Sequence, residues 1–272
     1  MQGVLASFHD EAARKYFYDA DIELVECSSF RLLCESLHNK TTDFNLMAVE
    51  NSIAGSILPN YLLLEQFKSR IIGEVYLRIE MQFMALKGQN IKELKTVHSH
   101  PMALFQCTEF LATMPNLQVI EAADTAESAK IIAQEKKLGC AAIASKLAAE
   151  VYDLEIYKKN IETDKQNYTR FLVVSRGELW RTSEIPNKTS LRFETNHRPG
   201  GLLEILEIFK KYNLNMTKLQ SVPIIGKPYQ YAFHVDLEWT DYDDLKKALT
   251  VLKNSNIHLL ELGEYFKQER PV

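Results

Sequence analysis

The sequence predicts an α/β protein with a two-lobed N-terminal part and a smaller C-terminal unit. Short apolar runs alternate with amphipathic stretches up to about residue 175, which is the rhythm of βαβ units. A polar break that contains Pro186 follows at Trp180–Lys188. After this break, residues 189–267 follow the order βαββαβ. A chain of 272 residues with 46% hydrophobic composition is long enough to bury the cores that this arrangement needs.

The N-terminal part is expected to form a largely parallel sheet with helices on its faces. The apolar runs are too short for helices, whereas the stretches between them are amphipathic. The predicted strands are Ile22–Cys27, Phe44–Val49, Leu94–His98, Leu117–Glu121, Cys140–Ala144 and Phe171–Val174. The predicted helices are Leu58–Lys68, Met102–Thr113, Ala126–Lys137 and Lys146–Val151.

Two segments are expected to connect the lobes. Ile71–Leu86 is long, β-branched and alternating, which suits an extended crossing from one lobe to the other. The strand Phe171–Val174 is expected to cross back. The first lobe then comprises about residues 1–76 with 160–178, and the second about 77–159, all within a unit of residues 1–178. A cleft between two lobes is a favoured place for a small-molecule site.

The C-terminal unit is expected to span residues 189–272 after a linker at 179–188. Pro199 leads into its first helix, and Gly226-Lys227-Pro228 predicts a turn between two strands. The expected strands are Ser190–Thr195, Leu214–Pro223, Tyr229–Trp239 and Ile257–Phe266, and the expected helices are Gly201–Tyr212 and Tyr242–Asn254. About 80 residues with so much exposed sheet would be marginal alone, so pairing with a second copy is expected.

Composition excludes several classes of protein. A net charge of −4 and a pI near 6 lack the excess positive charge expected of a protein that binds nucleic acid or an anionic membrane. No apolar run approaches the roughly 18 residues of a membrane span, and Met1–His9 does not have the pattern of a secretory leader. The four cysteines show neither C-x-x-C nor zinc-type spacing. A reduced, cytoplasmic protein is the expectation.

Three polar clusters follow predicted strands and could share one pocket. The first, Glu50–Ser56, enters a helix at Pro59, and its Gly55 would let backbone N–H groups approach an anion. The alternative is that Asn51, Ser52 and Ser56 are ordinary turn and cap residues. The third cluster, Asn167–Phe171, reads as a loop that delivers the hydroxyl of Thr169 to the mouth of a strand, or as simple β-propensity.

The second cluster, His98–Pro101, ends a strand and begins a helix at Pro101, which leaves Ser99 or His100 as the cap. Gln106 lies seven residues beyond Ser99, a spacing that puts both on roughly one helical face. The two histidines stand two apart without a nearby carboxylate, which is poor spacing for a metal. Asp124–Glu127 forms a capping box, which capping alone explains.

The remaining candidate groups favour binding of a small anion through hydrogen-bond donors and helix dipoles, without a metal or a cofactor. The sequence lacks the glycine-rich motifs of nucleotide and dinucleotide sites, the G-x-S-x-G elbow of hydrolases and the H-E-x-x-H motif of zinc proteases. The available groups are hydroxyls, amides and helix N-termini. Such groups orient an oxygen-rich anion and stabilise developing charge by fixed dipoles.

Taken together, these strings resemble the prephenate dehydratase family over nearly the whole chain. The E-N-S-x-x-G-S pattern of that family stands here as Glu50–Ser56, its S-H-P-x-A-L-x-Q-C as Ser99–Cys107, its D-T-A as Asp124–Ala126, and its T-R-F as Thr169–Phe171. The tail resembles an ACT regulatory domain, with P-G-A-L standing as Pro199–Leu202, followed by Asn215–Lys218 and Pro223. The resemblance implies a periplasmic-binding-protein-like catalytic part and a ferredoxin-like ACT domain.

The resemblance implies conversion of prephenate to phenylpyruvate, water and carbon dioxide without a cofactor. It assigns the catalytic roles to Asn51, Ser99, Gln106 and Thr169, with the Thr169 hydroxyl donating to the leaving oxygen. The implied substrate-binding residues are Glu50, Ser52, Gly55, Ser56, Arg170 and Phe171. The implied effector-binding residues are Gly200, Gly201, Leu202, Asn215, Gln220 and Ser221. Arg170 is expected either to hold a substrate carboxylate or to pair with an acidic side chain across the hinge.

Two departures from the family pattern matter. The opening strand and the G-P-x-G-T-F-S turn are incomplete, since Ala6 and His9 differ from it while Ser7 and Phe8 match. The ACT signature E-S-R-P reads Gln220–Pro223 here, so inhibition by L-phenylalanine is expected but weakened. Arogenate as substrate, or a non-catalytic role in binding a small acid or amino acid, remain alternatives. The resemblance implies a homodimer or a homotetramer.

Overall fold

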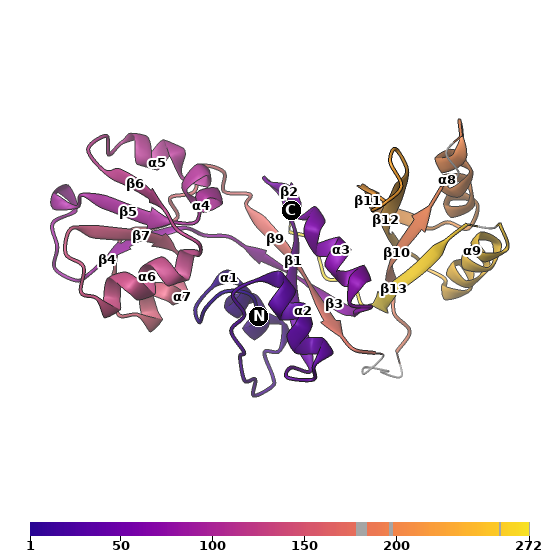
Figure 1. Cartoon of the computed structure of the whole chain (residues 1–272), viewed down its shortest axis with the longest axis horizontal. Helices are drawn as coiled ribbons and strands as arrows, with labels where there is room; N and C mark the ends of the chain where they lie inside the picture. The colour runs from indigo at the N-terminus through magenta and orange to yellow at the C-terminus, as the bar shows by residue number, and fades with distance from the viewer. Residues whose placement is uncertain (178–183, 196–197, 256, 272) are drawn as a thin grey trace.

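The computed structural model describes residues 1–177, 184–195, 198–255 and 257–271. Three sheets lie in a row along the long axis of the molecule (Figure 1). The sheet at the centre of Figure 1, here called the middle sheet, belongs to the first lobe. The five-stranded sheet at the left forms the second lobe, and the C-terminal sheet lies at the right.

The middle sheet has the strand order β2-β1-β9-β3, and every neighbouring pair in it is antiparallel. Its strands are β1 (Phe44–Asn51), β2 (Gly55–Ser56), β3 (Arg70–Arg78) and β9 (Tyr168–Ser175). The helices of this lobe are α1 (Phe8–Tyr16), α2 (Phe30–His38) and α3 (Leu58–Gln66). β9 lies in the centre because its run of buried residues, Arg170–Ser175, needs partners on both edges.

The five-stranded sheet has the order β6-β5-β7-β4-β8. Its strands are β4 (Gln82–Ala85), β5 (Thr96–Ser99), β6 (Gln118–Glu121), β7 (Cys140–Ala144) and β8 (Glu155–Lys158). Its helices are η1 (Ile91–Glu93), α4 (Pro101–Gln106), α5 (Thr108–Ala112), α6 (Thr125–Gln134) and α7 (Lys146–Val151). Only the β5–β6 and β5–β7 pairs among the described strands are parallel.

The expectation of a largely parallel sheet is therefore wrong. β9 pairs antiparallel with β1 and β3 in the middle sheet, and β4 pairs antiparallel with β7 and β8 in the five-stranded sheet. The predicted crossing at Ile71–Leu86 is confirmed, because β3 belongs to the middle sheet and β4 to the five-stranded sheet. The predicted return on Phe171–Val174 is displaced, because these residues lie within β9 of the middle sheet and the chain returns on residues 159–167 before it, where Ile161 and Asn167 bond the first crossing. Two antiparallel segments therefore join the lobes, one between β3 and β4 and the other between β8 and β9.

Near the N-terminus, the sequence patterns predicted one strand that the structure does not contain and failed to predict two helices. Ile22–Cys27 alternates as a strand would, but the structure gives it only an isolated bridge from Cys27 to Gln2 and Gly3. An alternating segment becomes a strand only where a partner edge is available. The helices α1 and α2 were not predicted, although Ser7 and Ser29 cap them by accepting backbone N–H groups.

The predicted helix Met102–Thr113 is broken into α4 and α5 at Cys107, whose φ of −112° leaves the helical range. The other start signals hold. Pro59 and Pro101 stand in the first turns of α3 and α4, and His100 caps α4. Asp124 caps α6 by accepting the backbone N–H of Glu127.

The C-terminal unit has the element order βαββαβ. Its strands are β10 (Lys188–Glu194), β11 (Asn215–Pro223), β12 (Tyr231–Glu238) and β13 (Leu259–Tyr265), in the antiparallel order β11-β12-β10-β13. Its helices are α8 (Gly201–Lys211) and α9 (Tyr242–Asn254), which pack on one face of the sheet around Leu191 and Phe193. The predicted turn at Gly226 lies between β11 and β12. Residues 179–183 of the predicted linker fall outside the described residues, and Lys188 already belongs to β10.

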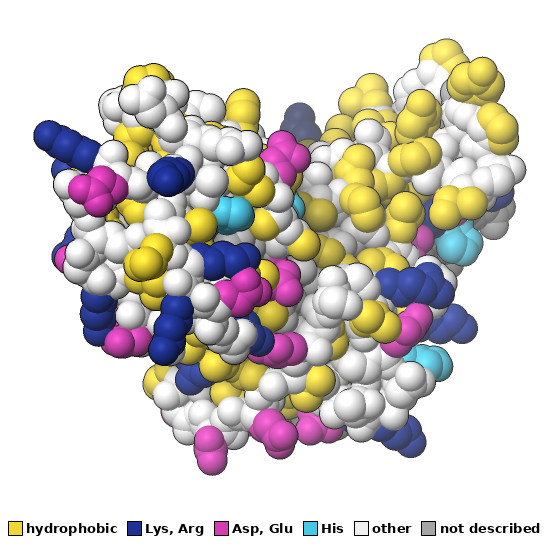
Figure 2. Space-filling view, turned by 60° about the vertical axis from the view of Figure 1, so that its left-hand side comes forward, with side chains coloured by type: hydrophobic (Ala, Val, Ile, Leu, Met, Phe, Trp, Pro, Cys, Tyr) yellow, Lys and Arg dark blue, Asp and Glu magenta, His cyan; other side chains and the backbone are white. Residues whose placement is uncertain are grey.

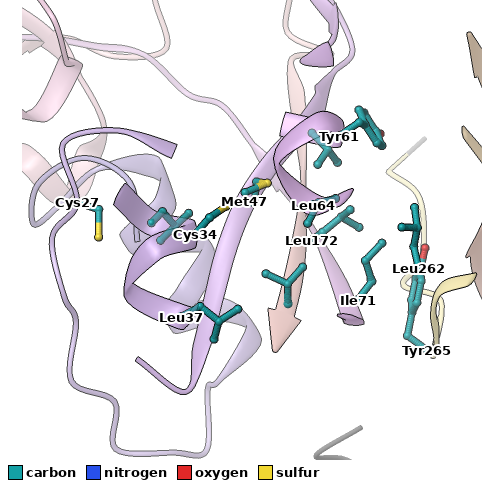
Figure 3. Close-up of a cluster of buried hydrophobic side chains, with 13 residues drawn as sticks. Cys27, Cys34, Leu37, Met47, Tyr61, Leu64, Ile71, Leu172, Leu262 and Tyr265 are labelled. Carbon is teal, nitrogen blue, oxygen red and sulfur yellow. The ribbon is translucent and has the colours of Figure 1, made fainter. Parts of the chain in front are cut away.

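The C-terminal sheet packs directly on the first lobe. Leu262 and Tyr265 of β13 join the same buried cluster as Ile71 and Leu172 of the middle sheet (Figure 3). At Gly263 a Cβ atom would stand 2.0 Å from the carbonyl oxygen of Ile71, so only glycine permits this approach. The two units thus share a continuous apolar core. Across the described residues, the structure contains no helix of the length and hydropathy that a membrane span requires.

Candidate active site at the junction of the lobes

Asn51 and Thr169 stand opposite each other in the middle sheet. Asn51 ends β1 and Thr169 lies near the start of β9, and the antiparallel register pairs the two residues. The Asn51 amide Nδ2 donates to Thr169 Oγ1 at 3.0 Å. It also donates to the carbonyl oxygen of Tyr168 at 3.2 Å. Because Thr169 Oγ1 accepts this bond, its own proton remains available for another acceptor.

Two further amides close a ring with Asn51 across the lobes. Asn167 Oδ1 accepts from Asn51 Nδ2 at 2.8 Å, and Asn167 Nδ2 donates to Gln106 Oε1 at 2.8 Å. Gln106 Nε2 in turn lies 3.4 Å from Asn51 Oδ1. Gln106 comes from α4 of the second lobe, so these three side chains, here called the amide cluster, bridge the two lobes. The cluster is neutral and fully hydrogen-bonded, which holds Asn51 in one orientation.

The amide cluster borders a cavity of about 440 Å³. Asn51, Gln106 and Thr169 line it together with apolar side chains that include Phe8, Ile57 and Phe171. A small oxygen-rich ring would fit this volume, with apolar walls against the ring and a few fixed donors for its oxygens. Donors that are already oriented stabilise developing charge without further reorganisation.

Ser99 does not join this group, contrary to the expectation from its spacing with Gln106. Its side chain is fully buried in β5, and its hydroxyl donates to the carbonyl oxygen of Ile143 at 2.6 Å. It does not appear among the described residues around the cavity, whereas His100 and Gln106 do. The helical-face argument does not apply because the helix begins only at Pro101, which leaves Ser99 in the strand.

The polar residues after Asn51 shape the loop. The Ser52 hydroxyl donates to the carbonyl oxygen of Gln166 at 2.7 Å and accepts the backbone N–H of Tyr168 at 2.9 Å. Ser52 thereby ties the two polar loops together. Gly55 has a φ of +78°, which a side chain would strain, and its surroundings are open. Neither Ser52 nor Gly55 lines the cavity described above.

Glu50, Ser56 and Arg170 face the C-terminal sheet instead of the cavity. Side chains alternate along a strand, so the neighbours of Asn51 and Thr169 point to the opposite face. Arg170 is only 3% exposed and donates to Glu74 Oε2 at 2.7 Å and to Asp236. Glu50 and Ser56 both contact Lys218 Nζ, at 2.9 and 3.1 Å. Of the two roles expected for Arg170, the structure favours pairing with acidic side chains.

His9 also lines this cavity. The sequence patterns predict no role for it and identify it only as a difference from the family's G-P-x-G-T-F-S turn. Its ring packs edge-on against Phe171 with centroids 4.9 Å apart, and Phe30 lies beside it. Its Nε2 is buried and has no hydrogen-bond partner among the described residues. Burial lowers the pKa of His9 to about 3, so the imidazole is neutral near pH 7. The sequence signal that could have identified His9 is its position in the first helical turn after the capping serine, Ser7.

Burial of neutral His9 predicts acid lability. In the unfolded chain His9 binds a proton near pH 6.5, whereas the folded state takes it up only near pH 3. Between these values the unfolded state binds more protons, so His9 reduces stability as the pH falls from 6.5 toward 3. The slope is about 1.4 kcal/mol per pH unit. We expect His9→Gln to remove this slope in denaturant titrations across that range. The exposed His38→Gln variant should retain it, and an unchanged slope in His9→Gln would contradict the assignment.

The predicted effector residues divide into two groups. Gly200, Gly201 and Leu202 line a second cavity of about 370 Å³ at the start of α8, together with Arg198 and Tyr231. The unsatisfied N–H groups at a helix start favour an anionic group there. Asn215, Gln220 and Ser221 lie on the edge strand β11 and do not line this cavity.

Comparison with known proteins gives a consistent family. A family model described as "Prephenate dehydratase" matches residues 1–179. A bifunctional chorismate mutase/prephenate dehydratase of Aquifex aeolicus (strain VF5) is 35% identical, over 97% of this chain and 72% of that protein. Arogenate dehydratase/prephenate dehydratase 2 of Arabidopsis thaliana is 35% identical, over 97% of this chain and 71% of that protein.

Solved structures share the whole architecture. The chain described as GqqA, a quorum quenching acylase, has a TM-score of 0.87 and 28% identity, with 98% of this chain and 97% of that chain covered. The prephenate dehydratase of Arthrobacter aurescens in complex with L-Phe has a TM-score of 0.87 and 24% identity, with 100% of this chain and 91% of that chain covered. The likeness extends over both lobes and the C-terminal unit.

Proposed function

Because the chain belongs to the prephenate dehydratase family, we propose that it converts prephenate to phenylpyruvate, water and carbon dioxide at Thr169 and the amide cluster. The reaction aromatises the ring of prephenate, which loses its ring carboxylate as carbon dioxide and the hydroxyl para to it. Aromatisation is strongly downhill. The enzyme therefore needs chiefly to orient the dianion and to assist departure of the hydroxide.

The observation that supports this role is the hydrogen bond from Asn51 Nδ2 to Thr169 Oγ1. An amide that donates to the hydroxyl oxygen leaves the hydroxyl proton free to be donated to the leaving oxygen of the substrate. A positioned proton donor contributes typically about 10²–10⁴ in rate. Since a threonine hydroxyl is a weak acid, orientation within the cavity supplies much of the remaining barrier lowering.

The proposed division of labour follows from where the side chains lie. Asn51 and Gln106 hold and orient the site, and Phe171 and its apolar neighbours contact the ring. Residues 1–178 form the proposed catalytic unit, 179–188 the linker and 189–272 the ACT unit. We place the protein in the cytoplasm, the compartment where a cofactor-free enzyme of amino-acid biosynthesis with unpaired cysteines fits.

Two other substrates come from the names of similar proteins. The Arabidopsis relative carries arogenate dehydratase in its name, and arogenate differs from prephenate by an amine in place of the keto group. The acylase likeness suggests amide hydrolysis, which requires a nucleophile paired with a base. Thr169 is paired with an amide, which cannot take its proton, so this arrangement favours dehydration.

L-phenylalanine is the proposed effector, bound through its carboxylate at the start of α8 beside Gly200 and Gly201. Hydrophobic side chains gather on the C-terminal unit, at the right of Figure 2. The exposed ones on this unit include Leu203, Leu219, Ile225, Tyr229 and Tyr231. Pairing of two such units would cover these side chains, so we propose a homodimer as the smallest assembly and a homotetramer as the larger one.

The function is tested by incubating the purified protein separately with prephenate and with arogenate at neutral pH. We expect phenylpyruvate from prephenate at a kcat/KM at least about tenfold above that for arogenate. Millimolar L-phenylalanine in the same assay is expected to lower the rate. Phenylalanine formed faster from arogenate would reassign the substrate, and no product from either would reject the function. Flat activity with effector would reject the effector alone.

A further inference from the structure

One face of the C-terminal sheet is polar, buried and turned toward the first lobe. Along β10, Leu191 and Phe193 pack under α8 and α9, whereas Lys188, Ser190 and Arg192 point to the other face. These three polar side chains are between 0% and 7% exposed. They are buried because the middle sheet and α3 of the first lobe cover them, and Figure 3 shows β13 residues Leu262 and Tyr265 beside that sheet.

Arg170 is the centre of the contact. Its guanidinium donates to Glu74 Oε2 at 2.7 Å, to Tyr265 Oη at 3.0 Å, and to Asp236 Oδ2. Asp236 Oδ1 also accepts from the Ser190 hydroxyl at 2.6 Å. Of these five side chains, Arg170 and Glu74 lie on the middle sheet. The other three, Tyr265, Asp236 and Ser190, lie on the C-terminal sheet. The residue that follows Thr169 is therefore fixed by side chains of the C-terminal unit.

A second contact reaches the other strand that carries the site. Lys218 Nζ of β11 donates to Glu50 Oε2 at 2.9 Å and to Ser56 Oγ at 3.1 Å. Glu50 directly precedes Asn51, and it pairs with Arg170 in the strand register. Lys218 is 9% exposed, whereas the side chain of Glu50 is 40% exposed, so the lysine end of this ion pair is the part removed from water. Each of the paired residues Asn51 and Thr169 thus has a chain neighbour anchored in the C-terminal sheet.

We propose that Asp236 and Lys218 are positioning residues for the reaction at Thr169. Through Arg170 and Glu50 they set the spacing and tilt of β9 and β1, and with it the bond between Asn51 Nδ2 and Thr169 Oγ1. The inference rests on the proposed function of that site. A displacement of about 1 Å in a catalytic group can cost about 10²-fold in rate, so small changes at this interface reach the reaction.

The buried ion pair between Asp236 and Arg170 is costly to separate. Burial acts to raise the pKa of Asp236, but Arg170 and the Ser190 hydroxyl outweigh it and hold that pKa below its usual value. Asp236 is therefore ionised beside Arg170. A buried charge that loses its partner is costly, so the strands follow the C-terminal sheet when it moves. A ligand that shifts the C-terminal unit would act on Thr169 through the same two contacts.

The structure supplies a matched control at the same interface. Arg192 Nε lies 2.9 Å from Glu65 Oε2, and Arg192 is 7% exposed. Like Asp236, Arg192 projects from the polar face of the C-terminal sheet onto the first lobe. Glu65, however, belongs to α3, which carries none of the amide cluster. Loss of the Arg192–Glu65 pair weakens the interface without releasing β1 or β9.

The test compares Asp236→Asn and Lys218→Met with Arg192→Gln in the full chain. We expect each of the first two to lower kcat at least about tenfold while KM changes less than about threefold. Arg192→Gln should keep kcat within about twofold, and Asp236→Glu should recover part of the loss because it keeps the charge. Denaturant titrations report the stability of each variant, and Lys218→Met carries the test if Asp236→Asn does not fold.

Amide hydrogen exchange provides a readout that needs no substrate. We expect faster exchange in residues 44–56 and 166–175 of Asp236→Asn and Lys218→Met, and wild-type exchange there in Arg192→Gln. Unchanged kcat and exchange in both positioning variants would overturn the inference, as would an equal loss in Arg192→Gln. If the wild-type protein does not act on prephenate, the proposed function fails, while the exchange pattern still decides whether the two strands depend on the C-terminal sheet.

Discussion

We expect Thr169→Val to lower kcat by about 10²–10⁴-fold with little change in KM. Valine keeps the shape and the β-propensity of threonine but removes the hydroxyl, which accepts from Asn51 and is the proposed donor to the leaving oxygen. Binding of the dianion depends on several other groups around the cavity, so loss of one hydroxyl should affect chiefly the transition state. Steady-state kinetics with prephenate measure both constants.

Two further variants serve as controls for Thr169→Val. Thr169→Ser keeps the hydroxyl and should retain much of the turnover. Thr96→Val makes the same replacement in β5 of the second lobe, where the Thr96 hydroxyl bonds His98 at 3.0 Å, and should leave kcat near the wild-type value. Turnover in Thr169→Val within about threefold of wild type would remove Thr169 from the mechanism.

The second large effect is expected from Asn51→Asp, which changes one amide nitrogen to an oxygen. A carboxylate cannot donate, so the Thr169 hydroxyl would turn its proton toward the new carboxylate and away from the substrate. We expect kcat to fall by about 10²-fold or more. The side-chain oxygen of Asn167 would also lose its donor, which should lower the free energy of unfolding by about 1–3 kcal/mol, whereas the carbonyl oxygen of Tyr168 keeps the backbone N–H of Ser52. Kinetics and denaturant titrations measure the two effects.

Asn60→Asp separates the loss of turnover from the loss of stability. Asn60 is also a buried asparagine of the first lobe, and its Nδ2 donates to the carbonyl oxygen of Ala48 at 2.6 Å. The variant should lose stability in the same way yet keep its turnover. Equal losses of kcat in Asn51→Asp and Asn60→Asp would show that the amide of Asn51 has no particular role at Thr169.

Much of the fold could be predicted from the sequence because its signals are local. Pro59, Pro101 and Asp124 marked helix starts correctly, since capping and the missing proline N–H act within one turn. The element order of the C-terminal unit followed from alternation and turn residues. The strand predicted at Ile22–Cys27 failed because a strand needs a partner edge, and that partner is a property of the whole chain.

The site could be predicted only in part. Asn51, Gln106 and Thr169 meet as expected, although they lie far apart in the sequence. The sequence predicts only a loop at Asn167, whereas in the structure its side chain completes the amide cluster. The spacing with Gln106 and the family pattern both predict Ser99 in the site, but the helix starts two residues later and the Ser99 hydroxyl bonds the carbonyl oxygen of Ile143.

The sequence by itself indicated the kind of chemistry, because hydroxyls and amides at strand ends suit the binding and orientation of a small anion. It also determined the chain's family through the order of its motifs. Only the tertiary structure decided which neighbour in each motif faces the cavity between the lobes. Asn51 and Thr169 turn to the cavity, whereas Glu50 and Arg170 turn to the C-terminal sheet. Successive side chains on a strand point to opposite faces, and what covers each face depends on how distant sheets pack.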